Sequence, residues 1–166
     1  MTDRLRAGIV GARFMGQVHA RAVRAAGGVV ARVAASTPER AAAAAAQLGT
    51  AGWAESAEAL VSTDDVDVVD ICTPNALHAP VANLALGAGK PVVCEKTLAT
   101  SVEDARGLTA QAAAAALVAT VPFVYRFYPT VREARGRAGR TPAPAPRLLP
   151  AGIRDIASGT PLLPAR

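Results

Sequence analysis

An apolar run, a glycine-containing turn and a helix-like pattern follow one another in the segment LRAGIVGARFMGQVHA, residues 5–20. This order is typical of a strand–turn–helix unit that holds the pyrophosphate of a dinucleotide at the N-terminus of the helix. The usual motif is G-x-G-x-x-G, and this chain reads GARFMG. Gly11 and Gly16 supply the first and third glycines, whereas Arg13 stands at the middle one. The segment therefore predicts a nucleotide site with one unusual position.

Each position of this turn has a separate expected task. Gly11 allows a tight turn with positive φ, and Gly16 lets the helix lie close to the strand. Arg13 gives up some of the close approach of the backbone to the pyrophosphate but brings a guanidinium suited to phosphate oxygens. Phe14 and Met15 complete the expected cofactor-binding turn. The alternative is that the two glycines only shape a tight strand-to-helix connection.

The length and composition favour one globular domain with a sizeable core. The chain has 166 residues and is 51% hydrophobic, which argues against disorder of the whole chain. It contains no apolar stretch long enough to span a bilayer, and its first residues do not resemble a secretory signal. Cys72 and Cys94 show no metal-binding or C-x-x-C spacing, so we expect buried free thiols and no metal site. These features predict a cytoplasmic protein without membrane partners.

The positive charge is confined to the end of the chain. Residues 1–133 contain 12 Lys+Arg and 12 Asp+Glu, so their net charge is zero. The net charge of +5 comes from six later arginines against Asp155 alone. No aromatic or basic recognition motif accompanies this charge, so we do not expect nucleic-acid binding.

Short apolar runs alternate with helical patterns, as in a doubly wound parallel α/β sheet of the Rossmann type. The expected strands are residues 5–10, 29–34, 52–54, 66–72, 91–94 and 117–121. The expected helices are residues 15–26, 38–48, 55–61, 77–86 and 101–116. Ligands of such sheets bind beyond the carboxyl ends of the strands. Three of these ends carry polar clusters, namely Ser36, Thr37 and Arg40, then TPNALH at 73–78, then Glu95-Lys96-Thr97.

The end of the second strand bears on the choice of cofactor. NAD-binding chains usually carry an acid about 20 residues beyond the glycine turn, which binds the ribose 2′-hydroxyl. Here the matching place holds Ala35 and Ser36. Hydroxyl groups followed by Arg40 suit a 2′-phosphate better, and we expect Arg13 to reach the same region. The sequence thus favours NADP over NAD, unless Ser36 and Thr37 only cap the next helix.

Three stretches resemble the glucose–fructose oxidoreductase / inositol dehydrogenase (Gfo/Idh/MocA) family of NAD(P)-dependent dehydrogenases. They are GIVGARFMGQVHA, then DVVDICTPNALHAPVANLALGAGKPVVCEKTLATS, then PFVYRFYPTVREAR. In that family the second stretch typically reads TPN-x-x-H, a helix ending in G-K, a strand and then E-K-P. The resemblance covers roughly residues 5–135.

The resemblance implies roles for the matching positions. Gly11 and Gly16 would frame the pyrophosphate, and Ser36 would stand near the adenosine ribose. The nicotinamide side would be lined by Thr73, Pro74, Asn75 and His78, with Glu95 and Lys96 near the nicotinamide ring and the reacting hydroxyl.

Lys96 is the expected catalytic residue. An ammonium group partly removed from water has a lowered pKa and can orient or polarise a hydroxyl. The alternative is that Lys96 only neutralises Glu95. His78 is open to a simpler role, a hydrogen bond to a neighbouring loop, and we expect His19 to be structural.

The chain departs from the family at Arg13 and at Thr97 in place of proline. We also expect that it lacks the family's second α+β domain. We expect residues 1–135 to form the NAD(P)-binding domain and residues 136–166 to form a disordered or off-frame tail rich in Pro, Arg and Ala. A frameshift near codons 136–140 is one hypothesis for this tail, and a naturally short relative is the other. The expected function is that of an oxidoreductase acting on a sugar or polyol hydroxyl, truncated to its nucleotide-binding half. The alternatives are a catalytically inactive dinucleotide-binding module and a non-functional truncated product.

Overall fold

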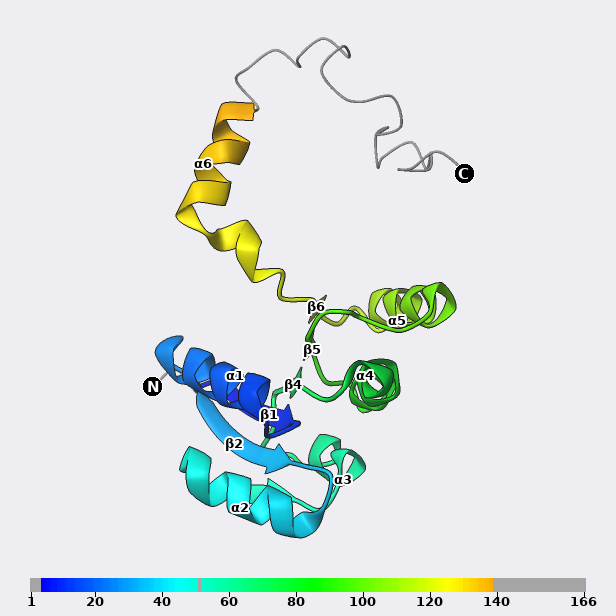
Figure 1. Ribbon diagram of the computed structural model, residues 1–166. Helices are drawn as coiled ribbons and strands as arrows, with labels where there is room; N and C mark the ends of the chain where they lie inside the picture. The colour runs from blue at the N-terminus through cyan, green and yellow to red at the C-terminus, as the bar shows by residue number, and fades with distance from the viewer. Residues whose placement is uncertain (1–3, 51, 139–166) are drawn as a thin grey trace, which may run out of the picture. The chain divides into compact units, whose positions relative to one another are not determined.

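A parallel sheet of six strands forms the centre of the protein (Figure 1). The computed structural model describes residues 4–50 and 52–138. The strand order is β3-β2-β1-β4-β5-β6, so the direction of winding changes between β1 and β4. The strands are β1 Arg6–Val10, β2 Val29–Ala34, β3 Gly52–Ala54, β4 Val68–Ile71, β5 Val92–Cys94 and β6 Ala119–Thr120.

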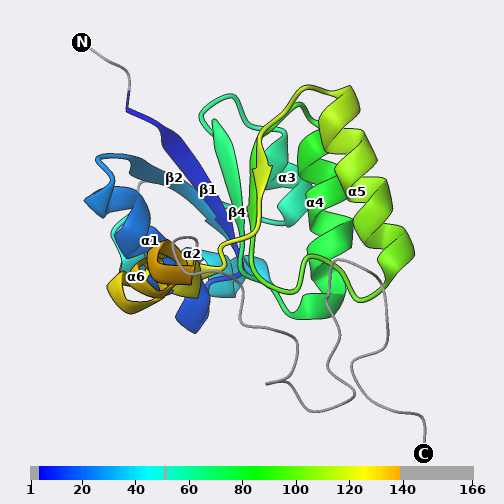
Figure 2. The same cartoon turned by 90° about the horizontal axis from the view of Figure 1, so that it is seen from above.

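Helices cover both faces of this sheet. Helices α1 and α2 lie on one face and α3, α4 and α5 on the other, as Figures 1 and 2 show. They are α1 Phe14–Ala25, α2 Pro38–Leu48, α3 Ala57–Val61, α4 His78–Gly87 and α5 Val102–Ala114, with the short 3-10 helix η1 at Asn75–Leu77 before α4. This arrangement confirms the expected Rossmann-type α/β fold, and most element boundaries lie within two residues of those predicted.

Two apolar layers hold the sheet and its helices together. On the α1/α2 face, buried Ile9 and Val33 pack against small helix residues such as Ala20 and Ala44. The larger layer lies under α3, α4 and α5 and includes residues of every one of these helices, among them Leu60. Strand β4 is buried along its whole length, as expected for a central parallel strand.

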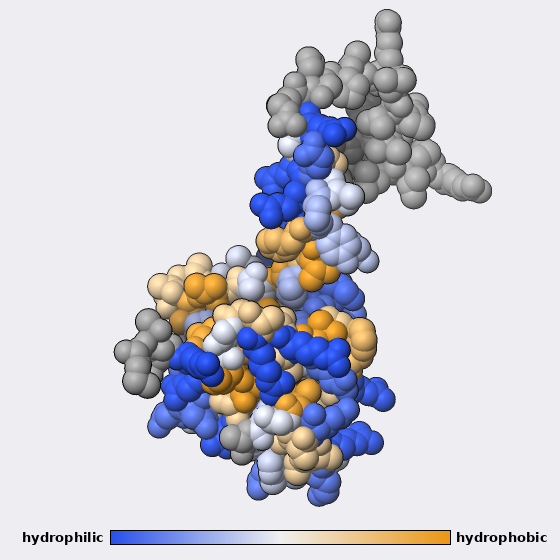
Figure 3. Space-filling view, turned by 90° about the vertical axis from the view of Figure 1, so that its left-hand side faces the viewer, coloured by the Kyte–Doolittle hydropathy of each residue, from blue (hydrophilic) through white to orange (hydrophobic). Residues whose placement is uncertain are grey.

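The chain divides into two units, residues 1–122 and residues 123–166. The first unit contains the whole sheet. The described part of the second unit contains the 3-10 helix η2, Val124–Phe127, and helix α6, Pro129–Ala138. Figure 3 shows the α6 part of this second unit as largely hydrophilic. Phe123 and Phe127, which precede α6 in the chain, are exposed. Most of the predicted tail, residues 139–166, lies outside the described residues.

Candidate dinucleotide-binding site

The turn after β1 depends on two glycines that permit very close backbone contacts. Gly11 has φ +101°, and a Cβ atom there would lie 2.5 Å from the carbonyl oxygen of Cys72, after β4. A Cβ atom on Gly16 would lie 2.1 Å from the carbonyl oxygen of Gly11. The turn therefore passes directly against the loop after β4, and α1 packs onto the turn. Both glycines have the conformational tasks predicted for them.

The N-terminus of α1 is open, unlike that of the capped helices. In the described chain, Arg13 at its N-cap makes no side-chain capping bond, and the first turn of α1 contains no acid. The contrasting helices α2, α3 and α5 are capped by Thr37, Ser56 and Ser101, and each has an acid in its first turn. The first N–H groups of a helix lack partners within the helix and carry partial positive charge. Helix α4 also lacks a side-chain cap, but the uncapped N-terminus of α1 follows the glycine turn directly, which suits it to a pyrophosphate.

The side chains of this first turn differ in exposure. Arg13 and Phe14 are exposed, whereas Met15 is half-buried. The Arg13 guanidinium is thus accessible to a phosphate oxygen next to the helix terminus. The exposed Phe14 ring, 75% accessible, leaves an apolar surface at the same place.

The hydroxyl groups after β2 have two different roles. Thr37 Oγ1 accepts a hydrogen bond from the backbone N–H of Arg40 at 3.3 Å and is the N-cap of α2. Ser36 Oγ accepts from Arg40 Nη1 at 2.9 Å and does not cap the helix. The interpretation that both residues are helix caps is therefore correct only for Thr37. Ser36 and Arg40 form a polar pair at the end of β2, where an acid is often found in NAD-binding chains.

The loop after β4 contains an unpartnered buried hydroxyl. Among the described residues, Thr73 Oγ1 is a buried side-chain oxygen with no hydrogen-bond partner. Buried polar groups normally have a partner, so this hydroxyl fits a site that a polar ligand completes. Pro74 and Asn75 follow it on the exposed part of the loop.

His78 is buried and joins two loops of the site. It is 1% exposed, with Nδ1 2.5 Å from the carbonyl oxygen of Thr97 and Nε2 2.9 Å from that of Thr73. These contacts agree with the alternative role of His78, which is to form a hydrogen bond to a neighbouring loop. Any influence of His78 on the nicotinamide side would pass through the two loops that it holds.

Glu95 and Lys96 lie in the loop after β5 but are not an ion pair. Lys96 is an exposed residue of this loop, and its catalytic role stays a prediction. Glu95 is buried, and its Oε2 accepts the backbone N–H of Lys96 at 3.1 Å. In the described chain the ion-pair partner of Glu95 is His19, which leaves the Lys96 ammonium available to another group.

A buried charged cluster lies beneath these loops, and sequence reasoning did not identify it. His19 Nδ1 donates to Asp70 Oδ1 at 2.9 Å, and His19 Nε2 donates to Glu95 Oε1 at 3.2 Å. The hydrogen bond to Asp70 raises the pKa of His19 to about 11. The sequence did carry a signal, because an acid within the apolar run VDVVDIC needs a buried partner.

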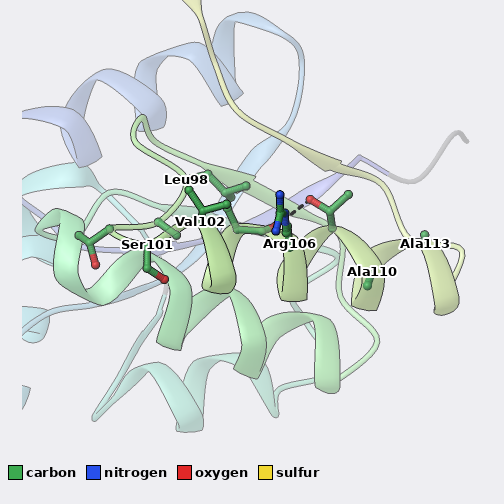
Figure 4. A pocket seen from close by; sticks show the side chains of 10 residues that line it. Leu98, Ser101, Val102, Arg106, Ala110 and Ala113 are labelled. Carbon is green, nitrogen blue, oxygen red and sulfur yellow. Dashed lines mark hydrogen bonds between the residues drawn. The ribbon is translucent and has the colours of Figure 1, made fainter. Parts of the chain in front are cut away.

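A separate groove runs along α5 and has a different character. It has a volume of about 700 Å³, and Figure 4 shows it lined by Leu98, Ser101, Val102, Arg106, Ala110 and Ala113. The lining is mostly small and apolar, and Ser101 already caps α5. The groove includes neither the glycine turn nor the loop after β4.

Comparison with known proteins agrees with this geometry. A family model described as "Oxidoreductase family, NAD-binding Rossmann fold" (Gfo/Idh/MocA) matches residues 5–123. The chain belongs to this family. The match includes the glycine turn, the TPN loop and the Glu95-Lys96 pair of this Gfo/Idh/MocA domain.

Several sugar dehydrogenases are similar to this Gfo/Idh/MocA domain. Levoglucosan dehydrogenase of Pseudarthrobacter phenanthrenivorans is 35% identical over 140 residues, which are 79% of this chain and 36% of that protein. D-xylose 1-dehydrogenase (NADP(+)) 2 of Haloferax volcanii is 34% identical over 113 residues, 68% of this chain and 35% of that protein. A solved structure of levoglucosan dehydrogenase in complex with NADH has a TM-score of 0.79 at 33% identity, covering 83% of this chain and 40% of that one. The chain thus spans about two-fifths of the length of these relatives.

Within the part of the chain that the structure describes, no helix has both the length and the apolar character needed to cross a membrane.

Proposed function

We propose that the chain binds a nicotinamide dinucleotide across the carboxyl ends of β1 and β4. The open N-terminus of α1, packed onto the Gly11–Gly16 turn, is the observation that carries this proposal. The pyrophosphate would accept hydrogen bonds from the first N–H groups of α1, and Arg13 would add a charged contact. Thr73 and the exposed part of its loop would face the nicotinamide half.

We propose NADP as the preferred form of the cofactor. Arg40 Nη1 and Ser36 Oγ meet at 2.9 Å at the end of β2, and together they offer a cation and a hydroxyl to a 2′-phosphate. A carboxylate at this place would favour the 2′-hydroxyl of NAD. The name of the Haloferax relative specifies NADP(+), which supports this preference, whereas the levoglucosan dehydrogenase structure contains NADH.

The proposed reaction of the protein that contains this domain is oxidation of a sugar or polyol hydroxyl. When bound, the oxidised nicotinamide would accept a hydride from the carbon that carries the reacting hydroxyl. The role proposed for Lys96 is to hold the reacting hydroxyl through its Nζ atom, which the exposed loop after β5 leaves free to meet a substrate. Levoglucosan and D-xylose, named in the relatives, define the substrate class. We expect a cytoplasmic protein that does not bind nucleic acid.

The second candidate function is dinucleotide binding without turnover. The exposure of Lys96 favours it, because an exposed side chain is not held in one position against a reacting hydroxyl. The glycine turn and the N-terminus of α1 would still bind the cofactor, so the chain would act as a dinucleotide-binding or dinucleotide-sensing module.

Binding and turnover separate the two candidates. The chain is titrated with NADPH and NADH, and alcohol oxidation is then assayed with sugars and polyols. Turnover that disappears in Lys96→Ala, with dinucleotide affinity retained, supports the oxidoreductase. Binding without turnover supports the module. Failure of the folded chain to bind either dinucleotide contradicts both.

A further inference from the structure

His19 connects elements that would bind opposite halves of the dinucleotide. It lies on α1, five residues beyond the first helical residue, at an axial distance of about 7.5 Å from it. Its partners come from other elements: Asp70 from β4 and Glu95 from the loop after β5. All three residues are at least nine-tenths buried. A bonded chain thus runs from the pyrophosphate helix to the loop that carries Lys96.

The contacts of the imidazole define its charge. Each ring nitrogen faces a carboxylate oxygen, so the cationic form donates both hydrogen bonds, whereas a neutral ring donates only one. Hydrogen bonds to Asp70 and Cys72 raise the pKa of His19, which keeps this form at neutral pH. The cation offsets two carboxylates that would otherwise lie uncompensated in the interior.

Glu95 links the His19 side chain to the backbone of Lys96. Its Oε1 accepts from His19 Nε2 at 3.2 Å, and its Oε2 accepts the Lys96 N–H at 3.1 Å. Both oxygens of one carboxylate are therefore used, one toward α1 and one toward the loop. A rotation of this carboxylate would release the Lys96 backbone from its position.

We propose that His19 is a positioning residue that fixes Lys96 relative to the N-terminus of α1, through the Glu95 carboxylate. Binding at the pyrophosphate end of the site is thereby coupled to the arrangement of its nicotinamide end. This inference rests on the proposed dinucleotide site and adds to it a residue that touches neither the cofactor nor the substrate.

The test compares a whole dinucleotide with the half that lacks the nicotinamide. NADPH is paired with 2′-phospho-ADP-ribose, and NADH with ADP-ribose. In His19→Gln and in Glu95→Gln we expect the dinucleotide affinity to fall on the order of 10-fold, while that of the matched half changes less than about 2-fold. The double variant is expected to lose no more than either single variant, because both interrupt one connection. Asp67→Asn, which removes the charge of Asp67 from its ion pair with Arg6, is the matched control for lost stability. It should leave the ratio of the whole-ligand and half-ligand affinities unchanged.

Amide hydrogen exchange of the unmodified chain gives a second readout that does not require a variant to fold. ADP-ribose or its 2′-phosphate, bound at α1, is expected to slow exchange at the Lys96 amide. If the folded variants lose equal affinity for the whole and the half ligand, the positioning role is overturned. It is also overturned if binding of the half ligand leaves the exchange rate of the Lys96 amide unchanged. Failure of the unmodified chain to bind any of these ligands would instead contradict the dinucleotide site itself.

Discussion

Gly16 packs against Gly11 so closely that a Cβ atom on Gly16 would lie 2.1 Å from the Gly11 carbonyl oxygen. The neighbour is backbone and cannot rotate away, so the turn and the helix would have to separate. We expect Gly16→Ala to lower the free energy of unfolding by about 2–4 kcal/mol and to weaken dinucleotide binding strongly. Urea unfolding and a titration of the folded fraction measure the two effects.

Gly107 provides the control for this substitution. It lies within α5, and apart from its chain neighbours and the backbone of its own helix, no described residue lies within 4 Å of where its Cβ would be. Gly107→Ala is expected to stabilise the protein by about 0.5–1 kcal/mol, because alanine favours a helix more than glycine does. A destabilising Gly107→Ala, or a neutral Gly16→Ala, would contradict the described packing.

The His19 cluster predicts how stability depends on pH. The folded pKa of His19 is raised from 6.5 to about 11, so the native state holds a proton that the unfolded chain releases. This contribution is fully present below pH 6.5 and falls by roughly 1.4 kcal/mol per pH unit between the two pKa values. Chemical unfolding at pH 7.0 and 8.0 measures it below the ordinary pKa of a thiol, so that Cys72 and Cys94, whose pKa values burial raises in the folded protein, contribute little. His19→Gln should make the free energy of unfolding depend less on pH. A variant whose stability falls as steeply as that of the unmodified protein would exclude His19 as the cause.

Ser36 and Arg40 predict a change of cofactor preference. Ser36→Asp would place a carboxylate where the pair now meets, which favours a ribose 2′-hydroxyl and repels a 2′-phosphate. We expect the ratio of the NADPH and NADH dissociation constants to rise about 10-fold or more. Arg40→Gln should weaken the binding of NADPH by about 1–2 kcal/mol and leave the binding of NADH nearly unchanged. Equal effects on the two dinucleotides would show that the 2′-phosphate is not bound here.

The buried Thr73 hydroxyl predicts opposite effects on stability and binding. Thr73→Val keeps the shape of the side chain and removes an oxygen that has no partner in the described chain. The free protein should gain about 1 kcal/mol of stability, whereas dinucleotide affinity should fall if the ligand uses the hydroxyl. Thermal unfolding with and without NADPH measures both. A destabilised Thr73→Val would indicate that the hydroxyl is already satisfied in the free protein.

Local sequence patterns predicted the sheet and the glycine turn, because both features depend on residues that are close in the sequence. Alternating apolar runs and helix-start residues gave the six strands and their helices, and GARFMG gave the tight turn. That Thr37 caps α2 and Ser36 does not depends on the backbone geometry at one residue, which the sequence pattern did not define.

The contacts between distant segments were not predictable in the same way. His19 is 51 residues from Asp70 and 76 from Glu95, and only the strand order brings them together. That same contact explains why Glu95 does not neutralise Lys96, since its carboxylate is turned toward α1 and the Lys96 backbone. Side-chain exposure of Lys96 likewise depends on how far the loop extends beyond β5, which spacing alone does not define.

A fluorescence titration of the folded chain with NADPH and with NADH tests the central claim most directly. The account predicts saturable binding at one site, tighter for NADPH, displaced by 2′-phospho-ADP-ribose. It also predicts that Ser36→Asp reverses the preference while far-ultraviolet circular dichroism stays unchanged. A folded chain that binds neither dinucleotide at millimolar concentration would contradict the account.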